Sequence, residues 1–354
     1  MTLIQAFRDQ SETCIRMGSP FMGKVLAILA NNWDETSRLG RKIAVYQGDI
    51  GPAGHSLPLR LAGGLHALVL RRASADLIAV YPPHAPPDAV LEEAIVTALT
   101  KNEDFLINWS ESPPQTNEVR RSAALIARAH VALSHFDRPI VLSELGASGG
   151  LNLMWDHFAL NAAGASFGPK AAALTLSPEW DGPPPPTAYP QLVDRSGVDL
   201  NPLNPQDKED LLRLTAYLWA DQPYRLDLTR AAASVMNATV SQGDAIAWLE
   251  QRLEDAPAGH LHLIQNTVAW QYFPAALQAR GIDLIEAAGA KATKKTPLGW
   301  MQMETDGDKT GAVGAALTLR LWPGDLKLDL GRADFHGRWI KWYGVEQTTV
   351  SACE

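Results

Sequence analysis

The chain has 354 residues, of which 46% are hydrophobic, and its formal net charge at pH 7 is −8. This length suggests one large or two medium domains with enough apolar material for a real core. The acidic balance argues against binding to a nucleic-acid backbone as the main activity, because such binding relies on clustered positive charge.

Residues 1–136 are expected to form a helical N-terminal domain, because apolar residues recur there at helical spacing between proline-rich loops. The expected helices include residues 22–30, 61–71, 89–100 and 118–136. Asp88 is placed to cap the third of these helices, since its side chain can accept a free N–H in the first turn.

From Pro139 onward strands and helices alternate, which predicts an α/β domain over residues 137–354 with a mostly parallel, Rossmann-like sheet. The expected strands are residues 140–145, 197–200, 237–241, 260–265 and 282–287. The expected helices are residues 151–162, 207–220, 245–254 and 274–280. An insertion near residues 164–196 is expected, because the first helix and second strand are too far apart for one turn. Residues 312–330 and 338–343 are typical of β-hairpins that would add antiparallel edge strands.

The most informative segment, residues 139–153, has the sequence P-I-V-L-S-E-L-G-A-S-G-G-L-N-L. An apolar strand leads into Glu144, and Gly146, Ser148 and Gly150 follow at alternate positions. Glycine tolerates positive φ and allows close approach to the backbone. Such a strand, turn and helix predict a cradle of backbone N–H groups for a polar ligand. The alternative is a glycine-rich turn that only connects the strand to the helix.

This loop fits E-x-G-x-S-x-G better than the dinucleotide fingerprint G-x-G-x-x-G. It resembles the first motif of class I S-adenosylmethionine-dependent methyltransferases, which implies that the loop backbone packs against the methionine part of that cofactor. The resemblance also implies that Asp199, at the end of the second strand, accepts hydrogen bonds from the ribose hydroxyls. Asp244, after the third strand, would lie near the adenine amine. Asp244 is equally placed to cap the helix that follows it.

Three further segments strengthen a second resemblance: P-P-Q-T-N-E-V-R-R-S-A-A-L at residues 113–125, R-S-G-V-D-L-N-P and H-G-R-W. With the glycine loop, they make nearly the whole chain resemble a bacterial family, domain of unknown function 2332. The resemblance implies a methyltransferase-like domain behind a helical N-terminal domain, and it supplies no substrate.

The start of the helix before the glycine loop supplies candidates for closing over the cofactor or substrate. They are Gln115, Thr116, Asn117, Glu118 and Arg121. An antiparallel return of this helix beside the glycine-loop strand would bring them to the ligand-binding edge of the sheet. Glu118 and Arg121 are spaced to share a helix face. The alternative is a well-capped helix with exposed charges.

The segment Q-N-T-V-A-W-Q-Y-F follows the fourth strand, where parallel sheets bind their ligands. Asn266, Thr267, Trp270 and Tyr272 are therefore placed to face a substrate. The default interpretation of the two aromatic residues is a core or interface role.

Three histidines bear on the chemistry. His336, in D-F-H-G-R-W, is a candidate general base because an imidazole titrates near neutral pH, and a structural role beside a tight turn is the alternative. His260 and His262 share one face of a strand but have no obvious third ligand, so no metal site is expected.

The sequence favours methyl transfer from S-adenosylmethionine to a small molecule or a protein side chain. The alternatives are a non-catalytic cofactor-binding protein and a nicotinamide-dependent oxidoreductase. Cys14 and Cys353 lack metal-type spacing and indicate unpaired thiols. With a polar N-terminus and no apolar run near the roughly 20 residues of a membrane span, a cytoplasmic location without a membrane partner is expected.

Overall fold

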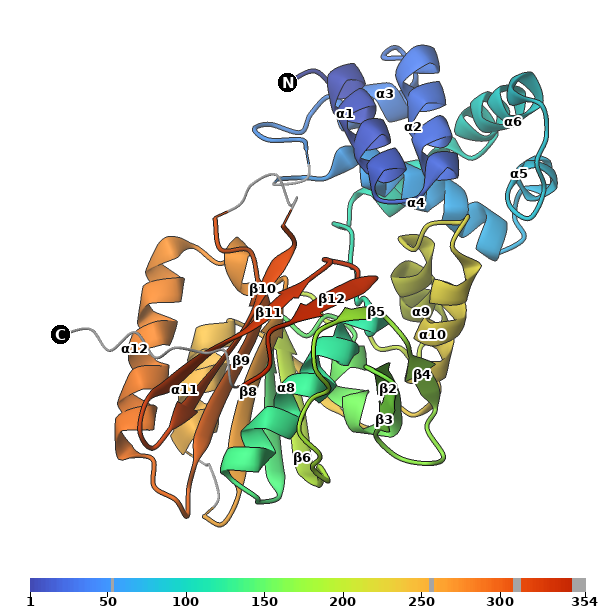
Figure 1. Ribbon diagram of the computed structural model, residues 1–354. Coiled ribbons are helices and arrows are strands. Elements are labelled where there is room, and N and C mark those ends of the chain that lie inside the picture. Colours follow the sequence, from blue (N-terminus) through green and yellow to red (C-terminus); the bar gives the residue numbers. More distant parts are fainter. Residues whose placement is uncertain (52–53, 255–257, 308–312, 346–354) are drawn as a thin grey trace. The chain divides into compact units, whose positions relative to one another are not determined.

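The computed structural model describes residues 1–51, 54–254, 258–307 and 313–345 (Figure 1). The chain divides into two compact units. The helical unit comprises Met1–Thr116 and Gln206–Asp227, and the sheet unit comprises Asn117–Pro205 and the chain from Leu228 onward. The division therefore differs from the boundary expected at residue 136, because residues 117–136 join the sheet unit and residues 206–227 join the helical unit. Cys353 lies outside the described residues.

The helical unit is built around a core of leucine, isoleucine and alanine side chains. Its helices are α1 (Leu3–Arg16), α2 (Pro20–Asn32), α3 (Arg38–Ile43), α4 (Leu57–Leu70), α5 (Ala75–Val80), α6 (Asp88–Lys101), α7 (Glu103–Ser110) and α9 (Lys208–Ala216). Asp207 caps α9 by accepting the N–H groups of Glu209 and Asp210. The expected cap at Asp88 is wrong, since Asp88 is the first residue of α6 and accepts a hydrogen bond from Lys24 instead.

Within the described residues, the sheet unit contains a nine-stranded sheet and a three-stranded sheet. The order in the large sheet is β5-β12-β11-β10-β9-β8-β1-β6-β7, and β7, β6, β1, β8 and β9 run parallel to their neighbours in that series. The strands are β1 (Ile140–Leu145), β2 (Phe158–Ala162), β3 (Ala165–Phe167), β4 (Leu174–Leu176), β5 (Glu179–Asp181), β6 (Leu192–Asp199), β7 (Thr239–Gln242), β8 (Leu261–Thr267), β9 (Leu298–Glu304), β10 (Ala315–Trp322), β11 (Leu326–Ala333) and β12 (Trp339–Trp342). A mixed α/β fold with a mostly parallel sheet and antiparallel strands β10, β11 and β12 is thereby confirmed.

Helices cover both faces of the large sheet (Figure 1). The helices and short 3₁₀ segments of this part are η1 (Val119–Arg121), α8 (Ser122–His135), η2 (Leu151–His157), α11 (Ala245–Glu254), η3 (Trp270–Tyr272) and α12 (Ala275–Lys291). The helix α10 (Pro223–Ser234) begins in the helical unit and ends in the sheet unit. Ile246 of α11 and Ile285 of α12 share a core with Leu145 and Ile264 of the sheet. Because side chains alternate across a strand, Glu144 and Gln265 lie on the opposite face, which α8 and η2 cover.

The strand expected over residues 282–287 and the helix expected over residues 151–162 are wrong. The expected helix over residues 274–280 and strand over 282–287 form the single helix α12, and the fifth parallel strand is β9. Gly281 does not break this helix, because its missing Cβ lets the helix pack against Trp270 and Ile246. The expected helix over residues 151–162 is the 3₁₀ segment η2 followed by β2. The insertion therefore begins with β2, earlier than residue 164.

Candidate functional site

The strand order of the parallel part defines a place for a ligand. When β1, β6, β7, β8 and β9 are numbered 1 to 5 in chain order, their spatial order in the sheet is 3-2-1-4-5. The central strand β1 therefore has β6 on one side and β8 on the other. In open α/β sheets, such a reversal leaves a crevice beyond the carboxyl ends of the strands. The residues that follow β1, β6 and β8 are therefore the candidate site.

The glycine loop after β1 folds back onto the end of β6. Gly146, Ser148 and Gly150 all have positive φ, at 71°, 53° and 72°. The N–H groups of Gly146 and Ala147 donate to the carbonyl oxygen of Val198 at 2.9 and 3.0 Å. Two glycines and one strained serine thus hold a tight turn at the carboxyl edge of the sheet.

Asp199 and Asn117 bind the remainder of this loop. The Ser148 N–H donates to Asp199 Oδ2 at 2.8 Å, while Asp199 Oδ1 accepts the N–H of Asn201 at 2.9 Å. The Leu151 N–H donates to Asn117 Oδ1 at 2.8 Å. These loop N–H groups are bonded within the protein, so the loop differs from the expected open cradle of donors. Each carboxylate oxygen of half-buried Asp199 retains capacity for a further donor.

Packing explains why the loop contains glycine. A Cβ at Gly146 would lie 2.5 Å from the Cβ of Ala269, and a Cβ at Gly150 would lie 2.6 Å from Met236 Cε. Such distances are too short for carbon atoms in contact. The two glycines therefore permit close approach of other protein segments, irrespective of any ligand.

Glu144, the penultimate residue of β1, is a buried acid at this edge. Its side chain is 1% exposed, and Oε2 has no hydrogen-bond partner among the described residues. Burial raises the pKa of Glu144 to about 8, and the Asp199 carboxylate raises it further, while a hydrogen bond from Gln265 and the charge of Arg121 oppose the rise. A buried acid that titrates near neutral pH marks a candidate functional site.

The segment Asn117–Arg121 lies at the same edge, because Asn117 bonds to Leu151 after the glycine loop and Arg121 bonds to Thr267 at the end of β8. Arg121 donates from Nη1 to the carbonyl oxygen of Thr267, at the end of β8, and from Nε to that of Phe335. Glu118 pairs with Arg120, with 3.1 Å between Oε1 and Nε. Thr116 is exposed and belongs to the helical unit.

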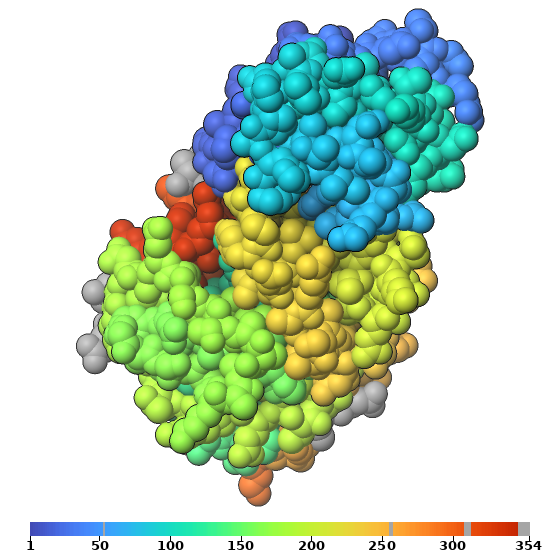
Figure 2. Space-filling model, turned by 90° about the vertical axis from the view of Figure 1, so that its right-hand side faces the viewer, coloured from blue at the N-terminus to red at the C-terminus, as the bar shows by residue number. Residues whose placement is uncertain are grey.

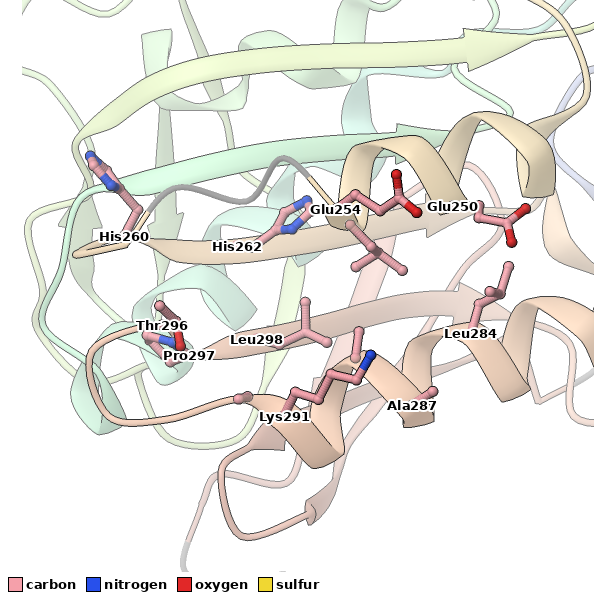
Figure 3. A pocket seen from close by; sticks show the side chains of 13 residues that line it. Glu250, Glu254, His260, His262, Leu284, Ala287, Lys291, Thr296, Pro297 and Leu298 are labelled. Carbon is pink, nitrogen blue, oxygen red and sulfur yellow. The ribbon is translucent and has the colours of Figure 1, made fainter.

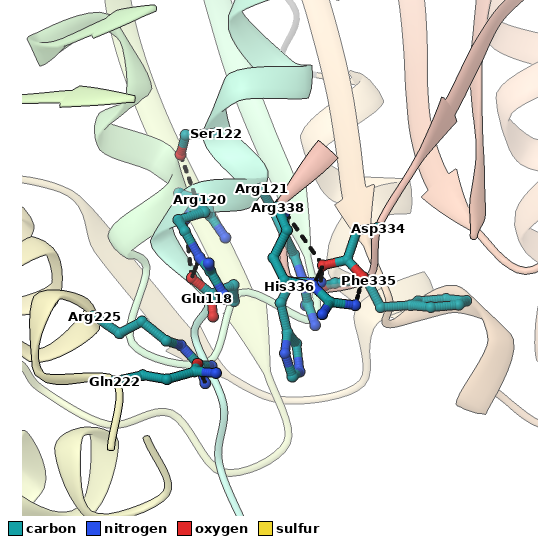
Figure 4. Close-up of polar contacts among 11 residues, drawn as sticks. Glu118, Arg120, Arg121, Ser122, Gln222, Arg225, Asp334, Phe335, His336 and Arg338 are labelled. Carbon is teal, nitrogen blue, oxygen red and sulfur yellow. Dashed lines mark hydrogen bonds and ion pairs between the residues drawn. The ribbon is translucent and has the colours of Figure 1, made fainter. Parts of the chain in front are cut away.

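The turn that contains His336 also packs on the segment Asn117–Arg121. Asp334 accepts the backbone N–H of His336 at 3.0 Å and forms an ion pair with Arg338, with Nη2 2.7 Å from Oδ2 (Figure 4). Gly337 lies so close to the backbone of Arg120 that a Cβ would come within 2.7 Å of its carbonyl oxygen. The turn is therefore held by Asp334 and by close packing on Arg120, and His336 itself is half-buried.

The residues after β8 are held by Glu304, which the sequence patterns do not single out. Glu304 Oε1 accepts hydrogen bonds from Asn266 Nδ2 and from the N–H groups of Ala269 and Trp270. Asn266 Oδ1 in turn accepts the indole N–H of Trp300, so its amide serves the protein interior. The only sequence signal for Glu304 is its place at the end of β9, a strand that the predicted order of elements lacks.

The other candidates after β7 and β8 have mixed environments. Trp270 is buried in the core with Trp300, in agreement with its default interpretation, whereas Tyr272 is 62% exposed. Thr267 is buried and contributes its carbonyl oxygen to Arg121. Asp244 Oδ1 accepts the N–H groups of Ile246 and Ala247, so it caps α11.

His260 and His262 lie at the opposite, amino end of β8, where they line a pocket of about 460 Å³ with residues of α11 and α12 (Figure 3). His262 Nε2 lies 2.8 Å from Ser143 Oγ, which also accepts a hydrogen bond from Arg252. Burial lowers the pKa of His262 to about 3. Among the described residues, no cluster of three metal-ligating side chains occurs.

Comparison with known proteins identifies a family. Residues 4–342 match the model of an uncharacterized protein family conserved in bacteria, DUF2332. The chain belongs to this family. No curated protein and no solved structure matches the chain. In the part of the chain described, no helix is both long and apolar enough to cross a bilayer.

Proposed function

We propose that this member of the DUF2332 family is an S-adenosylmethionine-dependent methyltransferase acting on a small molecule or a protein side chain. One observation carries the proposal. Glu144, Asp199 and Asp244 stand at or just beyond the carboxyl ends of β1, β6 and β7, which are adjacent parallel strands. A nucleoside laid across these strand ends would meet the carboxylates of Asp199 and Asp244 at neighbouring strand ends, next to the buried carboxyl group of Glu144.

The chemistry of these groups suits a nucleoside cofactor. Asp199 is half-buried and has acceptor capacity beyond its two backbone donors, which suits a ribose diol. Asp244 uses Oδ1 to cap α11, and Oδ2 is the oxygen that would accept an adenine amine. Glu144 lies at the same edge of the described sheet, but it is buried, so it would act on the site through its neighbours and not by direct contact with the nucleoside.

When bound, S-adenosylmethionine would supply an activated methyl group on its sulfonium, so that the protein needs few reacting side chains. The role of this chain would be to hold donor and acceptor in line and to exclude water. Asn117 and Arg121 support that role, because they fix the glycine loop and the end of β8 relative to each other.

A nicotinamide dinucleotide contains the same adenosine moiety and is the competing ligand. It would place a pyrophosphate against the glycine loop, which requires free loop N–H groups. The bonds that Gly146, Ala147 and Ser148 make within the protein favour the sulfonium cofactor, which has no phosphate.

Calorimetric titration of the full chain with S-adenosylmethionine, S-adenosylhomocysteine and NAD tests this proposal. We expect binding of the first two and none of NAD. Binding of NAD alone would favour an oxidoreductase. Saturable binding of S-adenosylhomocysteine without methyl transfer to any tested acceptor would favour a non-catalytic cofactor-binding protein, and no binding by any of the three would refute the nucleoside site.

A further inference from the structure

The pocket at the amino end of β8 lies apart from the nucleoside site proposed above. It has a volume of about 460 Å³, within the usual range for small-molecule sites. Its walls come from α11, from α12 and from the first residues of β8 and β9 (Figure 3). Its lining includes none of the strand-end residues described above and none of the inserted segment, residues 158–190, which is coloured green in Figure 2.

The floor of this pocket is aliphatic. Leu253 of α11, Leu284 of α12 and Leu298 of β9 line it, together with alanine side chains of α12. Leu253 and Leu284 are only half-buried, so part of their apolar surface still faces water. Covering such surface is favourable by about 25 cal/mol per Å². Apart from the two histidines, none of the described lining residues has a ring that a flat aromatic ligand could stack on.

Opposite charges face each other across this floor. Figure 3 shows Glu250 and Glu254 on α11 at one side of the pocket and Lys291 on α12 at the other. Glu250 forms an ion pair with Arg280 of α12. Within the described residues, Glu254 and Lys291 form no ion pair with each other or with a third side chain, although both are exposed. The pocket therefore presents one unpaired carboxylate and one unpaired ammonium group.

The charge of the lining restricts the ligand. Burial lowers the pKa of His262 to about 3, so this ring is neutral, and His260 Nδ1 lies 3.1 Å from the carbonyl oxygen of Ala258. A ligand with only a positive charge would face the ammonium group of Lys291, and a ligand with only a negative charge would face the carboxylate of Glu254. Like charges brought together disfavour binding. A ligand with one charge of each sign would pair with both groups.

We propose that this pocket binds a free amino acid with an aliphatic side chain, with the ammonium group of the ligand at Glu254 and its carboxylate at Lys291. The two charged groups of an amino acid share one carbon atom, so they can lie between two protein charges that do not reach each other. The aliphatic side chain would cover Leu253, Leu284 and Leu298. This pocket is then a second small-molecule site of the sheet unit, and the inference does not depend on the methyltransferase proposal.

Calorimetric titration of the full chain with L-leucine tests this inference, together with two analogues that each lack one charge. Isoamylamine is leucine without its carboxylate, and isocaproate is leucine without its ammonium group. We expect leucine to bind saturably and each analogue to bind about tenfold more weakly, as the loss of one hydrogen bond to a charged group predicts for partly exposed partners. Glycine, which lacks the aliphatic side chain, should also bind more weakly than leucine.

Two variants separate the two charges of the pocket. Glu254→Gln should weaken the binding of leucine and isoamylamine about tenfold and should not weaken the binding of isocaproate. Lys291→Met, which keeps an apolar stem, should weaken the binding of leucine and isocaproate and should not weaken that of isoamylamine. Lys295→Met is the matched control, because Lys295 is an exposed lysine outside the lining of the pocket. It should leave the affinity for all three compounds unchanged.

Three results would overturn the inference. The first is no binding of leucine, and the second is binding of either analogue as tightly as leucine. The third is equal affinity for leucine in Glu254→Gln, Lys291→Met and Lys295→Met. Saturation with S-adenosylhomocysteine should leave the affinity for leucine unchanged, and competition between the two would also overturn the inference, because it would place leucine at the strand ends.

Discussion

Asp199 Oδ2 accepts the backbone N–H of Ser148 at 2.8 Å and so joins the end of β6 to the loop that follows β1. The two strands are parallel neighbours, with Leu145 opposite Val198. The residue proposed to hold a ribose therefore also supports the loop proposed to hold the rest of the cofactor. A variant at Asp199 therefore affects both the binding of the ribose and the support of the loop, and its control must distinguish these two effects.

Asp199→Ala should lower the affinity for S-adenosylmethionine roughly ten- to a hundredfold, because hydrogen bonds to a charged acceptor contribute roughly 1.5–3 kcal/mol. Calorimetry gives the affinity and thermal unfolding gives the stability. Asp207→Ala is the control, since Asp207 also accepts two backbone N–H groups but belongs to the helical unit. Equal affinity in wild type and Asp199→Ala would remove Asp199 from the site.

Glu144→Gln should change how stability depends on pH. A glutamic acid ordinarily has a pKa of 4.5, and burial raises the pKa of Glu144 to about 8, so between these values the folded chain holds a proton that the unfolded chain releases. Wild type therefore loses stability as pH rises from about 4.5 to 8, and the variant should lack this loss, on the order of 5 kcal/mol. Urea unfolding at several pH values measures it, with the exposed Glu179→Gln as control. Parallel pH profiles for wild type and Glu144→Gln would contradict the raised pKa.

Gly146→Ala should destabilise the protein more than Gly164→Ala. Both glycines have similar positive φ, 71° and 76°, so each substitution carries the same backbone penalty, roughly 1–2 kcal/mol. A Cβ meets Ala269 at Gly146 but nothing within 4 Å at Gly164. Overpacking should add about 1–3 kcal/mol at Gly146 alone. Equal unfolding midpoints in urea would show that the loop relaxes freely.

Glu304→Ala should destabilise the sheet unit by at least about 3 kcal/mol, because it leaves several buried N–H donors without an acceptor. Burial raises the pKa of Glu304, which reduces the importance of its charge. Glu304→Gln, which keeps one acceptor oxygen, should therefore be destabilised less. Chemical denaturation of both variants compares them, and a larger loss in Glu304→Gln would refute the acceptor role.

The alternation of strands and helices after Pro139 predicts the mixed α/β fold and the start of the sheet, because β1 and β8 both begin with mainly apolar residues. It misplaces the fifth parallel strand, since Gly281 in the sequence looks like a break, whereas in α12 it is the point where the helix contacts Trp270. The position of the glycine loop between β1 and η2 follows from its local sequence. The N–H groups of this loop bond to Val198 and Asp199 because β1 pairs with β6, which is far from it in the sequence. No local sequence pattern contains such a pairing.

Residues 206–227 belong to the helical unit although they lie between two parts of the sheet unit in the sequence, and this affects how the two units can be produced separately. Neither unit corresponds to one uninterrupted stretch of chain. Truncation after residue 116 would therefore remove α9 and Tyr217. The surface of α4 beside Gly63, which Tyr217 covers, would then be exposed to solvent. An isolated helical unit would require residues 206–227 to be spliced onto residue 116 through a new linker. A gene fragment that follows the boundary at residue 136 would instead carry α8 without the sheet that buries it, and its expected fate is aggregation.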